Sequence, residues 1–416
     1  MLAHGMVHTY ELSIPIFVTI WLAEFEVIAI AGVEVGVTQA TLGLVVTAGY
    51  GLFGVGALPG GILVDRFGSR RLIAACLFGM GGSFFLLGVA PDLVVVAISL
   101  LLWGLAASVY HPAGLTLISK GMEDRGTGFA YHGAAGNVGI GLGPLLAAIL
   151  LLVFDWTTVA TVLAVPAILA GLYALRAEFD ETAAVDGVGT DGGEPRTQGG
   201  VDSLSEFVTE SKLLFAGAFV VVFLIVIANG LFYRGVLTFL PNLLEGLPGF
   251  EPIPLAALVP GVEAGSGRTL KPERYFYAGL LLVGVAGQYL GGKLTDRVPP
   301  EYGIAGVFGL LAVLALSFLP VAELGIGPLF ALGTVFGITL FAAQPLYQAA
   351  VADYTPSGTR GLSYGYTYLG SFGVGALGGA VAGAVLTYAD AATLFGVLAG
   401  FALVASAAAV YLVVRD

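Results

Sequence analysis

Charged residues are scarce in this chain. Only 11% of its 416 residues are Asp, Glu, Lys or Arg, whereas 57% are hydrophobic, and the mean hydropathy is +0.95. A soluble protein of this length cannot bury so large an apolar fraction, because its surface area grows too steeply with its mass. The composition therefore excludes an ordinary soluble domain and indicates a membrane protein.

Cysteine is nearly absent, since Cys76 is the one residue of this type, and this excludes an intramolecular disulfide. The sequence also lacks a Ser/His/Asp set and a phosphate-binding loop. Its four histidines lie on different predicted helices, with no short ligand spacing beyond His4 and His8. We therefore expect neither an enzyme nor an ATP-driven pump, and neither a cofactor nor a metal site.

Basic residues are outnumbered by acidic ones, 16 to 28, which leaves a net charge of −12. Such a balance does not suggest a nucleic-acid partner. The N-terminus has no basic region of the kind that precedes a signal peptide. The first apolar segment is therefore expected to stay in the protein as a membrane span.

Hydropathy predicts an all-α membrane protein with twelve transmembrane helices, each long enough to cross a hydrocarbon core of ~30 Å. An acidic, low-complexity stretch that cannot bury enough surface to fold separates two groups of six. The predicted domains are an N-terminal six-helix bundle at 1–176, an acidic cytoplasmic linker at 177–211 and a C-terminal six-helix bundle at 212–416. The predicted spans are 7–30, 40–60, 72–90, 93–119, 127–153, 156–175, 213–241, 274–294, 303–322, 326–352, 361–386 and 389–414.

The distribution of Lys and Arg predicts the orientation. If the N-terminus is cytoplasmic, twelve of the 16 basic residues fall on the cytoplasmic side, which is the bias that membrane proteins show. We therefore expect a multi-pass protein that is surrounded by the lipid bilayer of the cell membrane. Both of its termini are expected to lie in the cytoplasm. A monomer is expected.

The two halves of the sequence repeat each other. Residues 60–66 (GGILVDR) match residues 291–297 (GGKLTDR) at five of seven positions, and each copy ends the second span of its half. His111-Pro112 in the fourth span corresponds to Gln344-Pro345 in the tenth. Internal duplication of this kind is typical of secondary transporters, which rock one half against the other around a central site.

A charged loop follows the second span of each half. The first copy combines small, acidic and basic residues, and its charged residues can act as a latch at the cytoplasmic surface. Its glycines permit close packing and a tight turn. The second copy keeps only its first part, because Val298-Pro299-Pro300 replaces the basic tail. The latch residues are Gly61, Asp65, Arg66, Gly68, Arg70 and Arg71, with Asp296 and Arg297 in the second copy.

This pattern resembles the loop signature of the major facilitator superfamily, and the resemblance covers the whole chain. It implies that the first, fourth, seventh and tenth helices line a central cavity, whereas the third, sixth, ninth and twelfth face lipid. The sequence agrees with this arrangement, because the runs 72–90, 156–175, 303–322 and 391–414 contain no charged residue.

Two narrower resemblances point towards export. Gly139, Gly143 and Pro144 in the fifth span resemble the antiporter motif of the superfamily, which implies a close-packed, bent contact between the halves. Several segments also look like those of fosmidomycin-resistance-type exporters. They are His4 with His8 and Glu24, Tyr110-His111-Pro112, the run around Asn137, and 237–241.

Ionisable groups inside a membrane are costly and are therefore candidates for function. His4, His8 and Glu11 are spaced to share one face of the first helix, with His4 at the cytoplasmic mouth. A carboxylate beside an imidazole could bind and release a proton during transport. His111 could instead satisfy the carbonyl that Pro112 leaves free, and His132 could simply be interfacial.

Arg234 lies within the seventh span, where its charge needs a partner. Glu11, Glu24 or a substrate anion could serve, or the side chain could reach the interface. The candidates for substrate binding or proton coupling are His8, Glu11, Glu24, His111, His132, Asn137, Asn229, Tyr233, Arg234, Gln344 and Gln348.

The sequence thus predicts a secondary active transporter with alternating access. The function that the sequence favours is proton-coupled export, by antiport, of a small polar, anionic or amphiphilic compound such as a drug. One alternative is uptake of a nutrient anion or sugar by proton symport or facilitated diffusion. Another is a membrane sensor that does not transport.

Overall fold

The structure is a computed structural model of the 416-residue chain. It describes residues 1–178, 180–184, 204–258, 260, 267–356 and 359–415, without the side chains of Asp65, Leu204 and Arg360. Nearly all regular structure is helical. The elements of the first half are α1 (Leu2–Glu24), β1 (Val27–Ile30), β2 (Val33–Gly36), α2 (Gln39–Val55), α3 (Ala57–Phe67), α4 (Ser69–Gly88), α5 (Leu93–Ser108), α6 (Tyr110–Gly121), α7 (Arg125–Leu150) and α8 (Trp156–Arg176).

The second half begins with a helix that leads into the membrane-spanning part. Its elements are α9 (Leu204–Phe215), α10 (Phe219–Leu237), α11 (Leu240–Glu245), β3 (Ile253–Pro254), η1 (Leu255–Ala257), β4 (Thr269–Leu270), α12 (Pro272–Thr295), α13 (Pro300–Glu323), α14 (Ile326–Asp353), α15 (Arg360–Tyr368), η2 (Leu369–Val374), α16 (Leu377–Tyr388) and α17 (Ala391–Arg415). α9 covers residues 204–211 of the predicted linker, so this part of the acidic segment is helical.

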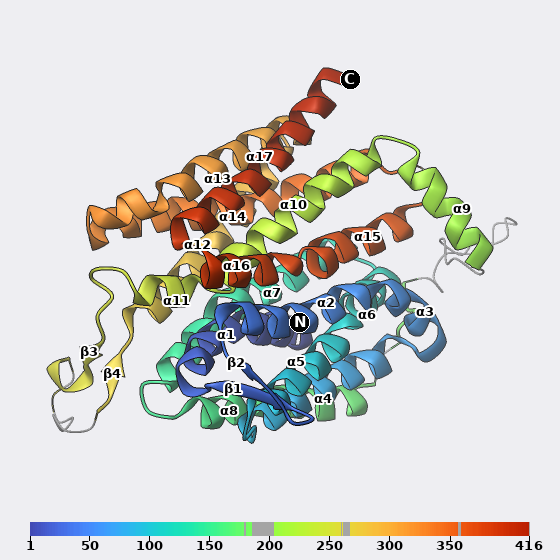
Figure 1. Ribbon diagram of the computed structural model, residues 1–416. Coiled ribbons are helices and arrows are strands. Elements are labelled where there is room, and N and C mark those ends of the chain that lie inside the picture. The colour runs from blue at the N-terminus through green and yellow to red at the C-terminus, as the bar shows by residue number, and fades with distance from the viewer. Residues whose placement is uncertain (179, 185–203, 259, 261–266, 357–358, 416) are drawn as a thin grey trace, which may run out of the picture.

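Eleven spans of the described residues are long and apolar enough to cross a membrane. The remaining predicted span, 274–294, is the 24-residue helix α12, which carries Glu273 and Arg274 in its first turn and Lys293 in its last. The predicted six-and-six arrangement of helices is therefore confirmed. The first half forms the lower layer in Figure 1 and the second half the upper one.

The predicted first span, 7–30, is wrong at both ends. α1 begins at Leu2 and ends at Glu24, and residues 27–36 form the antiparallel hairpin β1–β2. Ala31 and Gly32 have φ values of 49° and 85° at its two-residue turn, which suits the twist of a tight hairpin. The shift moves His4 into the first turn of a buried helix rather than leaving it at the mouth.

Two helical spans are interrupted beside the centre of the molecule. Val109 separates α5 from α6, so His111 lies in the first turn of a new helix. In the eleventh span, the π-helical turn η2 separates α15 from α16. Interruptions of this kind free backbone groups and often mark functional sites. Both bring side chains to the space between the halves.

The four helices that contain the charge-free runs lie away from the interface between the halves. α4 packs against α8, and α13 packs against α17. They expose large apolar side chains, among them Leu169 at 59% and Val313 at 59%. Such surfaces suit contact with lipid, as the sequence predicts for the third, sixth, ninth and twelfth spans.

Two groups of helices join the halves. In one, α2 packs against α16 and η2, and in the other, α7 packs against α12. Glycines permit these contacts. A Cβ on Gly383 of α16 would lie 2.1 Å from the carbonyl oxygen of Gln39, and one on Gly141 of α7 would lie 2.5 Å from Leu282 of α12. The backbones of the two halves therefore approach one another more closely than other residues would allow.

The expected role of Gly139 and Gly143 as contacts between the halves is wrong. A Cβ on Gly139 would lie 2.2 Å from the carbonyl oxygen of Gly5, and one on Gly143 would lie 2.7 Å from the Cα of Thr9. Both partners belong to α1, in the same half. These glycines, followed by the buried Pro144, instead hold α7 against the helix that carries His4, His8 and Glu11.

Candidate functional site

A cavity of about 290 Å³ lies between the halves. All four predicted cavity helices contribute to its wall, namely α1, α6, α10 and α14, and residues from α7, α12, α15 and η2 complete it. None of the lining residues found in the described part of the chain comes from α4, α8, α13 or α17. The lining includes His4, His8, Glu11, His111, His132, Asn137, Asn229, Tyr233, Gln288, Phe341, Gln344, Tyr347, Gln348, Tyr368 and Phe372.

The deepest polar contact in this region joins the two halves. Arg234 of α10 donates from Nη2 to Oε1 of Glu11 of α1, and both side chains are 1% exposed. Removing either charge would leave the other buried without a counter-charge, so the pair has to be kept together or hydrated together. Of the two carboxylates predicted as partners for Arg234, the structure selects Glu11.

Aromatic side chains fix the guanidinium of Arg234. Its Cζ lies 3.7 Å from the ring centre of Tyr50 and 5.4 Å from that of Tyr233. The hydroxyl of Tyr50 donates to the backbone carbonyl of Glu11 over 2.6 Å. Arg234 is thus enclosed and neutralised, and it is not among the residues that line the cavity. In this conformation the side chain is paired inside the protein and does not reach the membrane interface.

A chain of polar contacts leads from Glu11 along one face of α1. Nδ1 of His8 lies 2.6 Å from Oε2 of Glu11, and Nε2 of His8 lies 3.1 Å from Nε2 of His4. Nδ1 of His4 lies 2.7 Å from the backbone carbonyl oxygen of His132. The predicted spacing on one helical face is therefore realised, and it extends to His4. Because His8 is 12% exposed, the chain connects the buried ion pair with the cavity.

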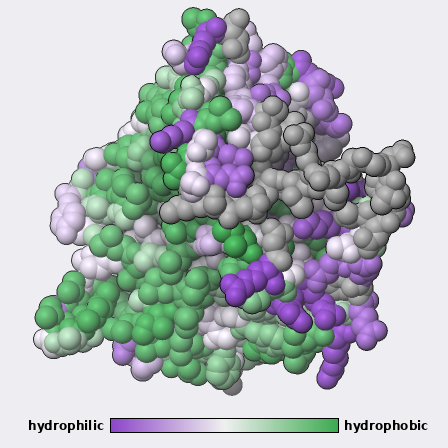
Figure 2. All heavy atoms as spheres, turned by 90° about the vertical axis from the view of Figure 1, so that its right-hand side faces the viewer, coloured by the Kyte–Doolittle hydropathy of each residue, from purple (hydrophilic) through white to green (hydrophobic). Residues whose placement is uncertain are grey.

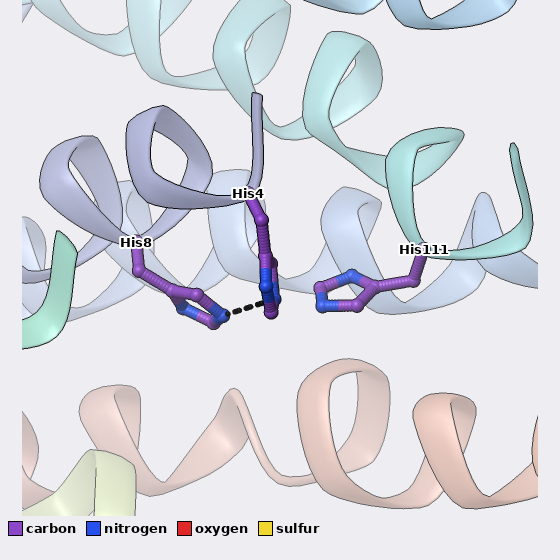
Figure 3. A group of neighbouring side chains, drawn as sticks. All are labelled: His4, His8 and His111. Atoms are coloured by element: carbon purple, nitrogen blue, oxygen red, sulfur yellow. Dashed lines mark hydrogen bonds between the residues drawn. The ribbon is translucent and has the colours of Figure 1, made fainter. Parts of the chain in front are cut away.

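The imidazoles of α6 and α7 complete this polar wall. The rings of His4 and His132 are stacked with their centroids 3.8 Å apart. The ring centroids of His111 and of Tyr368 in α15 are 4.9 Å apart. Figure 3 shows His8 and His111 on either side of His4, with all three rings turned towards one another. His111 is buried among these rings rather than exposed to lipid.

The amide candidates all reach the cavity. Asn137 of α7 and Asn229 of α10 line it from different halves, and Gln344 accepts a hydrogen bond of 2.9 Å from Gln288 of α12. Gln348 also lines it, one turn further along α14. These amides offer both donors and acceptors to a solute.

Glu24 is a predicted site residue that the fold places elsewhere. It lies at the exposed end of α1, where its Oε2 accepts a hydrogen bond of 2.6 Å from the indole of Trp156. It is not among the residues that line the cavity. Its contact ties α1 to α8 within one half, which gives it a structural role.

The predicted latch is a loop between α3 and α4 that is held by the segment after α8. The carboxylate of Glu181 accepts hydrogen bonds from the backbone N–H groups of Ser69 (2.7 Å) and Arg70 (3.2 Å), and the Arg70 guanidinium donates to the carbonyl of Ala177. A carboxylate is well placed at the N-terminus of a helix, where the orphan N–H groups need acceptors. Glu181 therefore anchors the start of α4.

The glycines of this loop differ in role. Gly68 has a φ of 78°, which favours glycine at the turn. A Cβ on Gly61 would have no atom within 4 Å, so the close packing expected at Gly61 is absent from the described structure. Arg66 and Arg71 are exposed, and the Asp65 side chain lies outside the described ones. In the second copy, Asp296 lies 3.5 Å from Lys293, both on the surface with Arg297.

The face that carries this loop is the polar end of the molecule. It lies on the right in Figure 1, where α3 and α9 are drawn. Seen from that side, hydrophilic side chains gather on the right of the face and apolar ones cover its lower left (Figure 2). The cavity residues Phe129 and Gln348 lie near the ends of α7 and α14 that belong to this side.

Sequence reasoning missed several residues of the site. Tyr50 and Gln288 lie on helices that the resemblance does not place at the cavity, and only their polarity within apolar spans could have marked them. His4 was set at the mouth because the first span was begun too late. Tyr368 of α15 also lines the cavity, while Tyr364, one turn away, is 44% exposed.

Comparison with known proteins adds a family. The family model described as Major Facilitator Superfamily matches residues 12–322. The puromycin resistance protein pur8 of Streptomyces alboniger is 32% identical over 126 residues, or 30% of this chain and 25% of that protein. The Na(+), Li(+), K(+)/H(+) antiporter of Planococcus maritimus is 32% identical over 141 residues, or 32% of each chain. The matches thus span about a third or less of these relatives.

Solved structures of similar fold cover the whole chain. A mutant of the nucleoside transporter NupG has a TM-score of 0.72 at 14% identity, and the match covers 99% of this chain and 97% of that one. A mutant of the peptide transporter POT, in complex with sulfate, has a TM-score of 0.70 at 15% identity, and the match covers 100% and 94%. At such identities the likeness establishes the fold alone.

Proposed function

The chain belongs to the Major Facilitator Superfamily, and from this premise we propose that it exports a small amphiphilic compound in exchange for protons. It is a multi-pass membrane transporter and not an enzyme. Its direction, its coupling ion and its solute are the content of the proposal.

The observation that carries the proposal is the ion pair of Glu11 and Arg234. It joins α1 of one half to α10 of the other, and Glu11 is also reached from the cavity through His8. A proton that arrives on Glu11 removes the negative charge that holds Arg234. The contact between the halves then weakens, so proton binding and the change of access become linked events.

Exchange follows if the proton and the solute use the cavity in turn. In the conformation described, Glu11 is paired with Arg234 and the cavity is free to receive a solute from the polar, loop-bearing end. After the halves rock and the solute leaves, a proton from the other side neutralises Glu11. Its release on the inside lets Glu11 pair with Arg234 again, as the protein returns to the conformation described. Because each ligand stabilises a different step, the proton gradient drives the solute outward.

The cavity wall favours an amphiphilic solute. Phe341, Phe372 and Tyr368 offer apolar and aromatic surface, while the amides of Asn137, Gln344 and Gln348 offer hydrogen bonds. The charge of Arg234 is already used by Glu11, which makes an anionic solute the less favoured choice. A relative named for puromycin resistance and another named as a cation/H(+) antiporter support proton-driven export.

We place the protein in the cell membrane with both termini in the cytoplasm. The loop between α3 and α4 carries Arg66, Arg70 and Arg71, and basic loops face the cytoplasm in most membrane proteins. With this orientation the ends of α7 and α14 that carry the cavity residues Phe129 and Gln348 face the cytoplasm, where an exporter meets its solute. Accessibility of a tag at either terminus in intact cells tests the placement.

Flux in oriented vesicles tests the function. Compounds that raise the melting temperature of the purified protein, sought among antibiotics, sugars and organic anions, are loaded into right-side-out and inverted proteoliposomes. Export by antiport predicts that an imposed pH gradient drives the compound opposite to protons. Movement in the same direction would establish the symport alternative. A gradient without effect in either orientation would remove the coupling claim.

A further inference from the structure

The structure assigns a metal site to the imidazoles of His4, His8 and His111. We propose that these three side chains bind one divalent transition-metal cation of the zinc class on the wall of the cavity. The inference goes beyond the proposed transport and does not depend on its direction or on its solute. It also reverses the expectation from sequence, which rested on the histidines lying on different helices.

The fold brings three potential ligand atoms together. One nitrogen from each of His4, His8 and His111 lies within 4.8 Å of the others, and the Nε2 atoms of His4 and His8 are 3.1 Å apart. Nitrogen ligands at 2.0–2.1 Å from a tetrahedral zinc ion stand about 3.3 Å apart. The first two ligands already have this separation, and His111 has to approach by at most about 1.5 Å.

Hydrogen bonds on the far side of the rings set which nitrogen faces the centre. Nδ1 of His4 contacts the carbonyl oxygen of His132 (2.7 Å), which only accepts, so this nitrogen carries the hydrogen. Nδ1 of His8 contacts the Glu11 carboxylate (2.6 Å), which accepts as well. In the neutral rings both Nε2 atoms therefore present lone pairs to each other over 3.1 Å. Two lone pairs at this distance repel unless a cation lies between them.

The same contacts match the surroundings of known metal sites. A histidine ligand usually donates its second N–H to a carboxylate or a backbone carbonyl, which orients the ring and makes it a stronger ligand. His8 has the carboxylate of Glu11, and His4 has the carbonyl of His132. Three imidazoles with one open position suit zinc, nickel, cobalt or copper, and they do not suit magnesium or calcium, which prefer oxygen.

The site is open on one side. His4, His8 and His111 all line the cavity, so water or an atom of a solute can complete the coordination. The three ligands come from α1 and α6 of the same half (Figure 3). Binding therefore does not require the halves to be in one particular arrangement. It places a positive charge on a cavity wall whose nearest arginine is neutralised by Glu11.

Metal binding by the full-length protein tests this site. The protein is purified in detergent without a polyhistidine tag, stripped with a chelator, and titrated with ZnCl2 by calorimetry. We expect one Zn2+ per chain, and a loss of affinity of about 100-fold or more for His4→Ala, His8→Ala and His111→Ala, since even removal of an outer partner costs 10–100-fold. The matched control His132→Gln removes an imidazole from the same cavity but no ligand, and it should retain binding.

A spectroscopic variant keeps the test independent of stability. In a Cys76→Ser background, His111→Cys loaded with Co2+ should show a thiolate-to-cobalt charge-transfer band. Cys76→Ser alone should not, because it removes the one native thiol. Absence of stoichiometric Zn2+ binding by the folded protein would overturn the proposal. So would binding that all three alanine variants retain, or a Co2+ spectrum without the charge-transfer band in the His111→Cys variant.

Discussion

Glu11 and Arg234 are 223 positions apart in the sequence and form a buried ion pair that joins the two halves of the protein. Neither residue could have this role alone. The carboxylate supplies the counter-charge that the buried guanidinium needs, and the guanidinium supplies the one that the carboxylate needs. The pair is therefore both a structural contact and the element that a proton can break.

A double-mutant cycle measures this contact. Glu11→Gln or Arg234→Gln alone leaves one buried charge unpaired, and each should lower the free energy of unfolding by about 3–5 kcal/mol. The double variant removes both charges and should recover most of that loss. Thermal unfolding in detergent provides the measurement. As a control, Glu245→Gln removes a partly exposed pair with Lys271 and should cost about 1 kcal/mol or less. Additive losses in the double variant would contradict the pairing.

His8 should matter for proton-driven flux, and Glu24 should not. His8 links Glu11 to the cavity, whereas Glu24 contacts Trp156 at the other end of α1. We expect His8→Gln to slow pH-driven transport by about 100-fold, the lower range for loss of a proton-transferring group. Solute exchange without a gradient should continue. Glu24→Gln should keep both activities within about twofold, and a large loss of gradient-driven flux in this variant would argue against the assignment.

Two of the three tyrosines of α15, Tyr368 and Tyr364, should differ in their effect on solute binding. Tyr368 lines the cavity beside His111, while Tyr364, one turn away, is exposed. Replacing Tyr368 by Leu should weaken binding of a stabilising compound by about two- to tenfold, because an aromatic contact contributes about 0.5–1.5 kcal/mol. The same change at Tyr364 should leave the affinity nearly unaltered. Equal effects at both positions, measured by calorimetry, would place the solute elsewhere.

Close contact between α2 and α16 makes Gly383 sensitive to substitution. A Cβ at this position would lie 2.1 Å from the carbonyl oxygen of Gln39 in the other half. Gly383→Ala should therefore lower the stability of this conformation by about 1–3 kcal/mol, the usual cost of overpacking. Thermal unfolding in detergent measures the change. Gly400 of α17 has open space around its Cα, so Gly400→Ala is the control and should be neutral or slightly stabilising.

Glu181 should protect the start of α4. Its carboxylate accepts from the N–H groups of Ser69 and Arg70, as an N-cap does, and loss of such a cap costs about 1 kcal/mol. Glu181→Ala should speed hydrogen exchange at these two amides. The nearby exposed Glu178 makes no such contact in the described structure, so Glu178→Ala should leave the exchange rates unchanged. Identical exchange in both variants would remove the capping role.

The helices could be predicted from the sequence because membrane spans follow directly from hydropathy. The correspondence between the two halves could be predicted because the loop motif is repeated. The residues at Glu11, His8 and Arg234 could be named for the same reason, since ionisable groups stand out in apolar segments. Their partners could not. Whether Glu11 or Glu24 meets Arg234 depends on how two halves pack, and no local pattern carries that information.

The clustering of the histidines shows the same limit. His4 and His8 are visibly one turn apart, but His111 approaches them only because Val109 breaks the fourth span and turns α6 towards α1. The start of α1 was also misplaced, because Leu2–Met6 is less apolar than the residues that follow while the hairpin after Glu24 is rich in Val and Ile. Hydropathy alone therefore places the hairpin, rather than the first turn of α1, within the first membrane span.

The distance between the inner ends of the two halves tests the central claim most directly. Spin labels on Arg125→Cys of α7 and Asp353→Cys of α14, in a Cys76→Ser background, report that distance in detergent or nanodiscs. On moving from mildly alkaline to mildly acidic buffer, the otherwise unaltered protein should gain a second, shorter population. Glu11→Gln, which mimics the protonated acid, should show this population in both buffers. Distance distributions that are the same with and without Glu11→Gln in both buffers would contradict the claim that this ion pair couples protons to the movement of the halves.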